Sequence, residues 1–344
     1  MTTANSIDIS VLTSYLELQL SWFKGPMTLE KFLGGQSNPT YKVIAQSGTY
    51  VLRSQPQGNL LKSAHAVDRE YQVLEALRNS QVPVADVYHL CKDTQVIGAM
   101  FYLMECCDGQ VYWDAALPEV QGNSMRTAMY DAMNKALVAL HSVDIKKVGL
   151  TDYGKPGNYF QRQLARWTTQ YKATELAHIA AVHELMQWLE VNLPEDDGRE
   201  CLVHGDFRLD NMMFARDKPE IIAVLDWELS TLGHPFADLA YQCMQLRMPQ
   251  GVGDIQGLQG IDRIKLGIPS EQEYVSLYCQ RMGIENIEHW TFYLSFSFFR
   301  LSAIAQGVAK RAVEGNASNK NANVVAGYVE PLAQMALSII NEQA

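Results

Sequence analysis

The chain has 344 residues, 47% of them apolar, and its 38 acidic against 28 basic residues give a formal net charge of −10. This length is enough for one large domain or two smaller ones. The acidic balance argues against nucleic acid and anionic membrane as partners, because both require basic faces. It would suit a cationic substrate, although many proteins are acidic for solubility alone.

Three further features bear on where the protein works. Its six cysteines form no CxxC pair, which is typical of reduced thiols in a cytoplasmic protein. The first ten residues lack a basic segment followed by an apolar run, so no signal peptide is predicted. The most apolar window, residues 290–310, is interrupted by Arg300 and predicts a buried core helix rather than a membrane span. We expect a cytoplasmic protein with no membrane partner, and its oligomeric state stays open.

The first third of the chain predicts a small helix and then a sheet. Residues 8–20 repeat apolar side chains at helical spacing behind Asp8, a candidate N-cap. A second amphipathic helix is predicted over 63–80. The segments that predict strands or extended chain are 28–35, 38–46, 48–55, 82–91 and 98–109.

The remainder of the chain predicts mostly helices. Long amphipathic patterns cover 124–144 and 161–193, and a helical region runs from 237 to the terminus with loops near 248–269 and 314–322. Only short apolar runs at 201–207, 211–215 and 221–227 read as strands. We therefore predict an α+β fold with a small antiparallel-sheet N-terminal lobe (1–104), a hinge (105–110) and a larger, mainly helical C-terminal lobe (111–344).

The polar residues between these short strands have the pattern that phosphoryl transfer requires. Asp206 and Asn211 lie five residues apart in a loop, where the carboxylate could accept the proton of a hydroxyl and the amide oxygen could bind Mg²⁺. Asp226 ends an apolar strand, a costly place for a charge unless it is paired or metal-bound. Taken singly, each aspartate could equally cap a turn, but the joint pattern is far more specific.

The joint pattern resembles the aminoglycoside phosphotransferase and choline kinase-like family, relatives of the protein kinases. HGDFRLDN (204–211) is similar to that family's catalytic loop, and VLDWE (224–228) to its metal-binding segment. Within the family, the chain looks most similar to the kinase-like domain joined to acyl-CoA dehydrogenase modules in larger proteins. Other matching segments are FLGGQSNPTYKV (32–43), TYVLR (49–53), DREYQVLEAL (68–77), FYLMECCDG (101–109) and HPFADLAY (234–241).

The resemblance implies roles for the residues of both motifs. Asp206 would be the catalytic carboxylate, while Asn211 and Asp226 would hold Mg²⁺ against the nucleotide phosphates. His204 would pack and hydrogen-bond the loop rather than act as a base, and Asp238 would brace it, because a buried carboxylate needs donors. Three further residues have weaker assignments: Arg208 could reach phosphate or remain an exposed charge, Glu228 could lie near the metal or face solvent, and Asp210 has no assigned role.

One position departs from the family pattern. Many members carry a lysine on the third strand, paired with a helix glutamate, whereas this chain has Arg53 with Glu70 as its expected partner. Arginine supplies the same charge but binds phosphate or carboxylate with two parallel donors. As an alternative, Arg53 could be an ordinary surface charge at a strand end.

The nucleotide would be held by two backbone segments. In the loop GGQSNPTY, Gly35, Ser37 and Asn38 would present N–H groups and side chains to phosphate. In the hinge, backbone groups of Glu105 and Cys107 would hydrogen-bond the purine. We thus expect an ATP- or GTP-dependent, Mg²⁺-requiring small-molecule kinase with its nucleotide in the cleft between lobes. The alternative is a non-catalytic nucleotide-binding or partner-binding module on the same fold.

Overall fold

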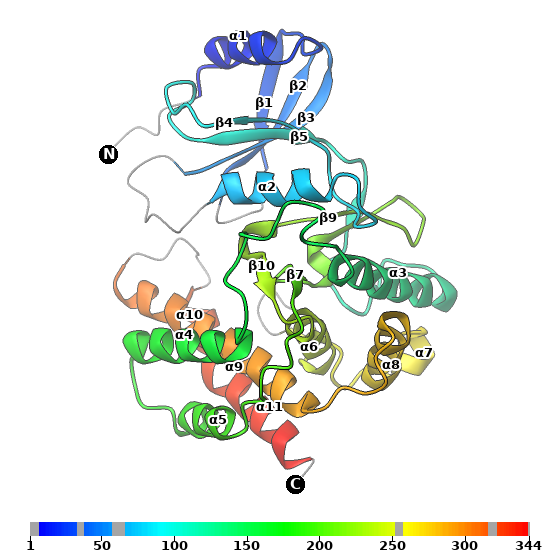
Figure 1. Ribbon diagram of the computed structural model, residues 1–344, viewed down its shortest axis with the longest axis vertical. Helices are drawn as coiled ribbons and strands as arrows, with labels where there is room; N and C mark the ends of the chain where they lie inside the picture. Colours follow the sequence, from blue (N-terminus) through cyan, green and yellow to red (C-terminus); the bar gives the residue numbers. More distant parts are fainter. Residues whose placement is uncertain (1–6, 33–37, 57–65, 252–256, 316–321, 343–344) are drawn as a thin grey trace. The chain divides into compact units, whose positions relative to one another are not determined.

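The computed structural model describes residues 7–32, 38–56, 66–251, 257–315 and 322–342 (Figure 1). By its internal contacts the chain forms two compact units. The first consists of Met1–Gly109 with Ile222–Glu228, and the second of Gln110–Ile221 with Leu229–Ala344. The sequence-predicted lobe boundaries assign residues 222–228 to the second lobe, whereas their contacts group them with the first unit.

The first unit is built on a five-stranded sheet in the order β1-β2-β3-β5-β4, in which every neighbouring pair is antiparallel. Asp8 caps the first helix by accepting hydrogen bonds from the N–H groups of Ser10 and Val11, which confirms its predicted N-cap role. The elements are α1 (Ile9–Gln19), β1 (Met27–Lys31), β2 (Thr40–Ala45), β3 (Gly48–Ser54), α2 (Val67–Leu77), β4 (Val87–Cys91), β5 (Phe101–Glu105) and the end of β9 (Ile221–Val224).

The two faces of strand β3 have different neighbours, because successive side chains of a strand point to opposite faces. Tyr50 and Leu52 belong to the apolar core that includes Leu12 and Leu16 of α1. Arg53 lies on the other face, directly across from Tyr102 of β5. Helix α2 packs against β4 and β5. The sheet therefore carries a charged strand residue on the face opposite its α1-side core.

The second unit is mainly helical, as the sequence predicts, with short paired strands β6–β8 and β7–β10 (Figure 1). Its helices are α3 (Asn123–His141), α4 (Tyr159–Thr174), α5 (Ala180–Val191), α6 (Phe236–Arg247), α7 (Arg263–Leu266), α8 (Glu271–Met282), α9 (Trp290–Val313), α10 (Ala322–Ala326) and α11 (Val329–Asn341). The strands are β6 (Gln110–Val111), β7 (Cys201–Val203), β8 (Met212–Phe214) and β10 (Thr231–Gly233), and 3-10 turns lie at Leu209–Asn211 and Trp227–Leu229.

Helix α9 is the central helix of this unit and contains the most apolar window of the sequence. It packs against α4, α5, α6, α10 and α11, which confirms the prediction of a buried core helix. By length and composition alone, one segment of the described residues, Val324–Asn341, is apolar enough to cross a membrane. A turn at Gly327 and Tyr328 interrupts this segment between α10 and α11, and α11 packs against α9.

Candidate functional site

The first unit gathers charged residues from three separate elements around Arg53. The Arg53 Nε lies 2.7 Å from Glu70 Oε2 on α2, and its Nη2 lies 2.7 Å from Asp226 Oδ1 in the segment after β9. Glu70 occupies the buried face of α2, in helical register with Val67, Val73, Leu74 and Leu77. The predicted pair of Arg53 and Glu70 is therefore present, and the same guanidinium also reaches Asp226.

Glu70 is the most enclosed member of this group, with only 1% of its surface exposed. Its carboxylate accepts a hydrogen bond of 2.8 Å from the Asn38 amide and one of 3.0 Å from the Tyr102 hydroxyl, in addition to Arg53. A buried carboxylate needs such donors to offset its lost hydration. These contacts fix Glu70, and through it the guanidinium of Arg53.

The charges of this group shift one another's titration. Burial alone would lower the pKa of Arg53, but the carboxylates of Glu70 and Asp226 raise it above its ordinary value. Burial raises the pKa of Glu70, and the hydrogen bonds from Arg53 and Tyr102 oppose that rise. Arg53 is therefore a permanent cation at this position.

Asp226 has the backbone geometry of a residue under local constraint. Its φ is +61°, a left-handed conformation that non-glycine residues adopt mainly where their surroundings impose it. Carboxylate oxygens of Asp226, Glu70 and Glu228 lie within 4.8 Å of one another. Such hard oxygen donors are the ligands that Mg²⁺ prefers, so these residues fit a divalent cation.

In the second unit, the loop after β7 brings Asp206 and Asn211 together. The Asn211 side-chain nitrogen donates 2.8 Å to the Asp206 carbonyl and 2.9 Å to the Asp206 carboxylate. These hydrogen bonds use only the amide nitrogen, so the amide oxygen of Asn211 stays available for a cation. The five-residue spacing therefore places both groups on one side of the loop, as the sequence predicts.

The loop is braced by a carboxylate from helix α6. Asp238 accepts the backbone N–H of His204 at 2.6 Å and that of Gly205 at 2.8 Å, and His141 lies 3.4 Å away. Burial opposes ionisation of Asp238, but His141 and the His204 N–H hold its pKa below the ordinary value. This arrangement confirms the predicted bracing role of Asp238.

Two neighbours of Asp206 in the loop are specialised for backbone geometry. His204 is fully buried and its Nδ1 accepts the N–H of Asp206 at 3.2 Å, which confirms its structural role. Gly205 has a φ of +83°, and a Cβ there would lie 2.7 Å from the Leu229 carbonyl oxygen. A glycine is therefore required between the histidine and the aspartate.

Asp206 is held in its ionised form. Burial would raise its pKa, but the guanidinium charge of Arg208, with a further contribution from that of Arg300, lowers it below the ordinary value. Arg208 lies 3.3 Å from Asp206 and 3.1 Å from Asp210, which gives Asp210 a role that its sequence position did not suggest. Arg208 is thus held within the loop between two carboxylates.

The predicted nucleotide-binding residues are only partly covered by the structure. Gly35 and Ser37 lie outside the described residues. Asn38 is described and buried, with its side chain directed to Glu70. In the predicted hinge, the Glu105 N–H donates to the Asp86 carbonyl, and the side chain of Cys107 is partly exposed.

Sequence reasoning missed three residues that contact or influence the predicted ones. Tyr102 donates a hydrogen bond to Glu70, and both Tyr241 and Arg300 help to lower the pKa of Asp206. A tyrosine in an apolar run gives no local signal of this kind. Arg300 does give one, because a single charge inside an otherwise apolar helix needs a reason to be there.

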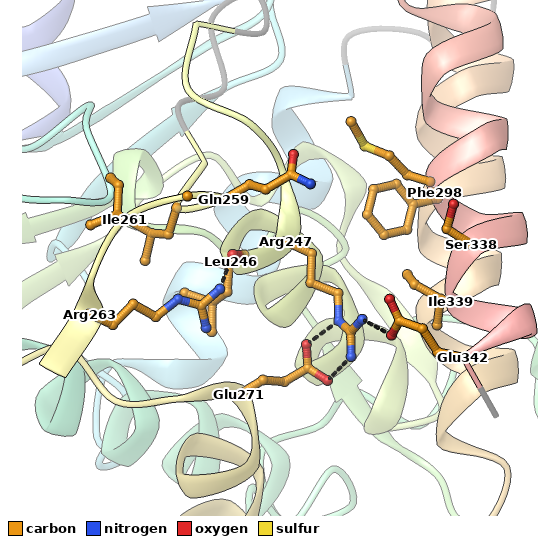
Figure 2. Close-up of a pocket in the computed structure, with 13 residues that line it drawn as sticks. Leu246, Arg247, Gln259, Ile261, Arg263, Glu271, Phe298, Ser338, Ile339 and Glu342 are labelled. Carbon is orange, nitrogen blue, oxygen red and sulfur yellow. Dashed lines mark hydrogen bonds and ion pairs between the residues drawn. The ribbon is translucent and has the colours of Figure 1, made fainter.

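Two other polar groups of the second unit lie apart from these residues. A pocket of about 450 Å³ is lined by residues of α6, α8, α9 and α11, and its Arg247 is paired with Glu271 and Glu342 (Figure 2). Elsewhere in the unit, ligand atoms of Glu175, His178 and His183 lie within 4.8 Å of one another, and a 2.7 Å hydrogen bond joins His183 to Glu175.

Comparison with known proteins assigns the chain to a family. Residues 28–266 match the profile of the phosphotransferase enzyme family, and the chain belongs to that family. It is 48% identical over 312 residues to mouse acyl-CoA dehydrogenase family member 10 and 40% identical over 340 residues to mouse acyl-CoA dehydrogenase family member 11. These matches cover 91% and 97% of this chain, which confirms the predicted subgroup.

The matched relatives are longer proteins. The chain spans 29% of the length of the first and 43% of the second. Among solved structures, a Ralstonia eutropha protein assigned as an aminoglycoside phosphotransferase is 45% identical, with a TM-score of 0.89 over 98% of this chain and 99% of that one. A spectinomycin phosphotransferase solved with ADP and spectinomycin shares the fold, with a TM-score of 0.63 over 97% of this chain and 99% of its own, at 13% identity. The α+β, kinase-like fold class is thereby confirmed.

Proposed function

We propose that this protein transfers the γ-phosphoryl group of ATP or GTP to a hydroxyl of a small molecule. The observation that carries the proposal is the braced loop in which Asp206 is kept ionised beside Asn211. Membership of the phosphotransferase enzyme family supports the same reaction class. A partner-binding module would have no need of an ionised aspartate held in this way.

Asp206 would orient the acceptor hydroxyl and accept its proton. Because its pKa lies below the ordinary carboxyl value, it is a free base throughout the neutral range. Asn211 and Asp226 would hold Mg²⁺ through their side-chain oxygens. When bound, the ion neutralises charge on the phosphate oxygens.

Arg53 would contribute a fixed positive charge for the nucleotide phosphates. Glu70 positions it from the buried side, and Asn38 and Tyr102 position Glu70. In the proposal, Gly35 and Ser37 contact phosphate, and the backbone of Glu105 and Cys107 contacts the base. Catalysis of this reaction depends mainly on positioning and charge, so residues that fix other residues matter to its rate.

Two acceptor classes follow from the relatives. The names of the acyl-CoA dehydrogenase relatives favour a hydroxyacyl compound or its CoA thioester. The aminoglycoside and spectinomycin kinases of the same fold suggest an amino sugar or amino alcohol instead. The acyl-CoA dehydrogenase relatives are 48% and 40% identical to this chain, whereas the spectinomycin kinase is 13% identical, so we place the first class first.

The test is ADP release from ATP and Mg²⁺ across hydroxy acids, hydroxyacyl-CoAs, sugars, amino alcohols and aminoglycosides. We expect one class to give turnover, and Asp206→Ala to reduce it by about a hundredfold or more while nucleotide still raises the melting temperature. Asp152→Ala, at an exposed position, is the matched control. Turnover that survives in Asp206→Ala would exclude this aspartate as the base, and nucleotide binding without release by any acceptor would favour a non-catalytic module.

A further inference from the structure

Arg300 is an unusual residue of helix α9. It is 8% exposed, and it is the only arginine or lysine among the buried residues that the structure describes. Within the described part of the chain its guanidinium makes no hydrogen bond and no ion pair. Burying a guanidinium without acceptors costs free energy, because its five N–H donors lose water and gain nothing in return.

Other arginines of the same unit are paired. Arg247 has two carboxylate partners at its pocket, as Figure 2 shows, with Glu271 at 2.6 Å and Glu342 at 3.2 Å. Arg281 donates 2.7 Å to the Asn134 side chain and also contacts Asp131. The fold therefore supplies acceptors to arginines that it partly buries, and Arg300 is an exception to that pattern.

Aromatic rings hold Arg300 in place without using its donors. Its guanidinium carbon lies 5.1 Å from the ring centre of Tyr241 on α6 and 5.7 Å from that of Trp167 on α4. Such cation–π contacts offset part of the cost of burial and fix the plane of the group. The N–H donors at the edge of that plane stay available.

These donors are open to a ligand. Some side-chain atoms of the described residues are fully enclosed and have no hydrogen-bond partner. The guanidinium nitrogens of Arg300 do not belong to that group. With 8% of its surface exposed, Arg300 keeps some contact with solvent. A small molecule reaching Asp206 from that side would therefore meet them.

The position of Arg300 relates it to the proposed base. Tyr241, whose ring the guanidinium faces, lies three residues after Asp238 on α6, and Asp238 accepts the backbone N–H groups of His204 and Gly205 directly before Asp206. Arg300 and the loop of the proposed base are thus held by neighbouring residues of one helix, α6.

We propose that Arg300 is the acceptor-recognition residue and that the acceptor carries an anionic oxygen group, which the guanidinium binds while the acceptor hydroxyl lies at Asp206. This inference rests on the proposed function and deepens it. A guanidinium forms its strongest hydrogen bonds with carboxylate and phosphate oxygens. A cationic amino sugar or choline would instead be repelled at this position.

The anion has two possible sources, a carboxylate of the acceptor itself or a phosphate of a CoA thioester. The experiment uses the full chain with ATP and Mg²⁺, and compares α-, β- and γ-hydroxy acids with diols of equal length. The CoA thioesters of the same acids and their uncharged pantetheine thioesters complete the panel. Arg300→Gln removes the charge, Arg300→Lys restores it, and Arg311→Gln, exposed on the same helix, is the matched control.

We expect Arg300→Gln to raise the KM for the anionic acceptor by about tenfold to a hundredfold and to leave the KM for ATP unchanged. Arg300→Lys should recover part of the loss, and Arg311→Gln should behave as the unmodified protein does. An effect confined to hydroxy acids identifies a carboxylate, and one confined to CoA thioesters identifies a CoA phosphate. An equal effect on pantetheine thioesters or diols overturns the proposal, because those acceptors carry no anion.

Failure of this inference is separable from failure of the proposed function. If no acceptor gives ADP release above that of Asp206→Ala, the proposed function fails. Arg300 is then judged by binding, as the shift in melting temperature that the hydroxy acids and CoA thioesters cause without nucleotide. A shift that is lost in Arg300→Gln and partly kept in Arg300→Lys supports the anion site, and a shift that is unchanged or absent in all proteins overturns it.

Discussion

The charged group around Arg53 and the loop around Asp206 are built in opposite ways. In the first unit, Arg53, Glu70 and Asp226 come from three elements, separated by 17 and 173 residues along the chain. In the second, Asp206 and Asn211 lie five residues apart in one loop, which a single distant carboxylate, Asp238, holds by its backbone. Packing between distant segments assembles the first group, whereas the second consists of residues close together in the chain. Asp238 holds this second group in place, and we call Asp238 with its two backbone hydrogen bonds the clamp.

The difference predicts how each region fails. In a group of paired side chains, removing one partner removes only the stabilisation of its own contact, because each partner contributes a separate contact. A loop that one carboxylate holds through backbone N–H groups loses all of this support when that carboxylate is replaced. Substitutions in the two regions should therefore differ in size and in which property they change.

The largest effect on stability is expected from the clamp. Asp238→Asn keeps the shape of the side chain. It replaces one of the two carboxylate oxygens that accept buried N–H groups with an NH2 group, which can only donate. We expect a loss of about 2–4 kcal/mol in the free energy of unfolding, measured in urea at neutral pH. Asp152→Asn, at an exposed position, is the control, and an equal change in both variants would contradict the clamp.

The same clamp predicts a pH dependence. Burial opposes ionisation of Asp238, but His141 and the His204 N–H lower its pKa, so its contribution to stability is complete above the ordinary carboxyl pKa. It is lost as the pH falls through the lower pKa of the folded state, that is, below about pH 4. The stability gap between the unmodified protein and Asp238→Asn should therefore narrow on acidification. A gap that stays constant from neutral to acidic pH would show that the charge of Asp238 contributes nothing.

A smaller effect is expected from Arg53→Lys, and mainly on activity. Lysine keeps the positive charge but cannot reach Glu70 and Asp226 with two fixed donors. We expect about a tenfold drop in kcat/KM for the nucleotide, since charge-assisted hydrogen bonds contribute roughly 1.5–3 kcal/mol each. Steady-state kinetics at varied ATP measures this, with Arg78→Lys as the control; an unchanged value would mean that charge alone is sufficient.

The smallest effect is expected from Tyr102→Phe. This change removes one of several donors to the Glu70 carboxylate and leaves Arg53 and Asn38 in place. We expect a loss of about 1 kcal/mol in unfolding free energy, the usual contribution of one hydrogen bond. Tyr71→Phe on α2, whose ring lies 6.1 Å from that of Tyr102, is the control. A much larger loss would mean that the first unit is clamped as tightly as the second.

The sequence predicted the local features of both regions well. Asp8 is a helix cap, and a cap is defined by its neighbours in the chain. The pairing of Arg53 with Glu70 and the bracing of the loop by Asp238 were predicted from the family resemblance. The partner of Asp210 and the grouping of residues 222–228 with the first unit were not predictable. The first depends on the directions of side chains within one loop, and the second depends on contacts between segments that no local pattern relates.

By itself, the sequence determined the order of sheet-rich and helical parts and the loop that brings Asp206 and Asn211 together. It could do so because hydrophobic periodicity and short spacings are local properties. Only the tertiary structure decided that Arg53 also reaches Asp226 and that Arg300 lies against Tyr241 without an ion-pair partner among the described residues. Both depend on which buried surfaces pack together, and that is settled by the fold as a whole.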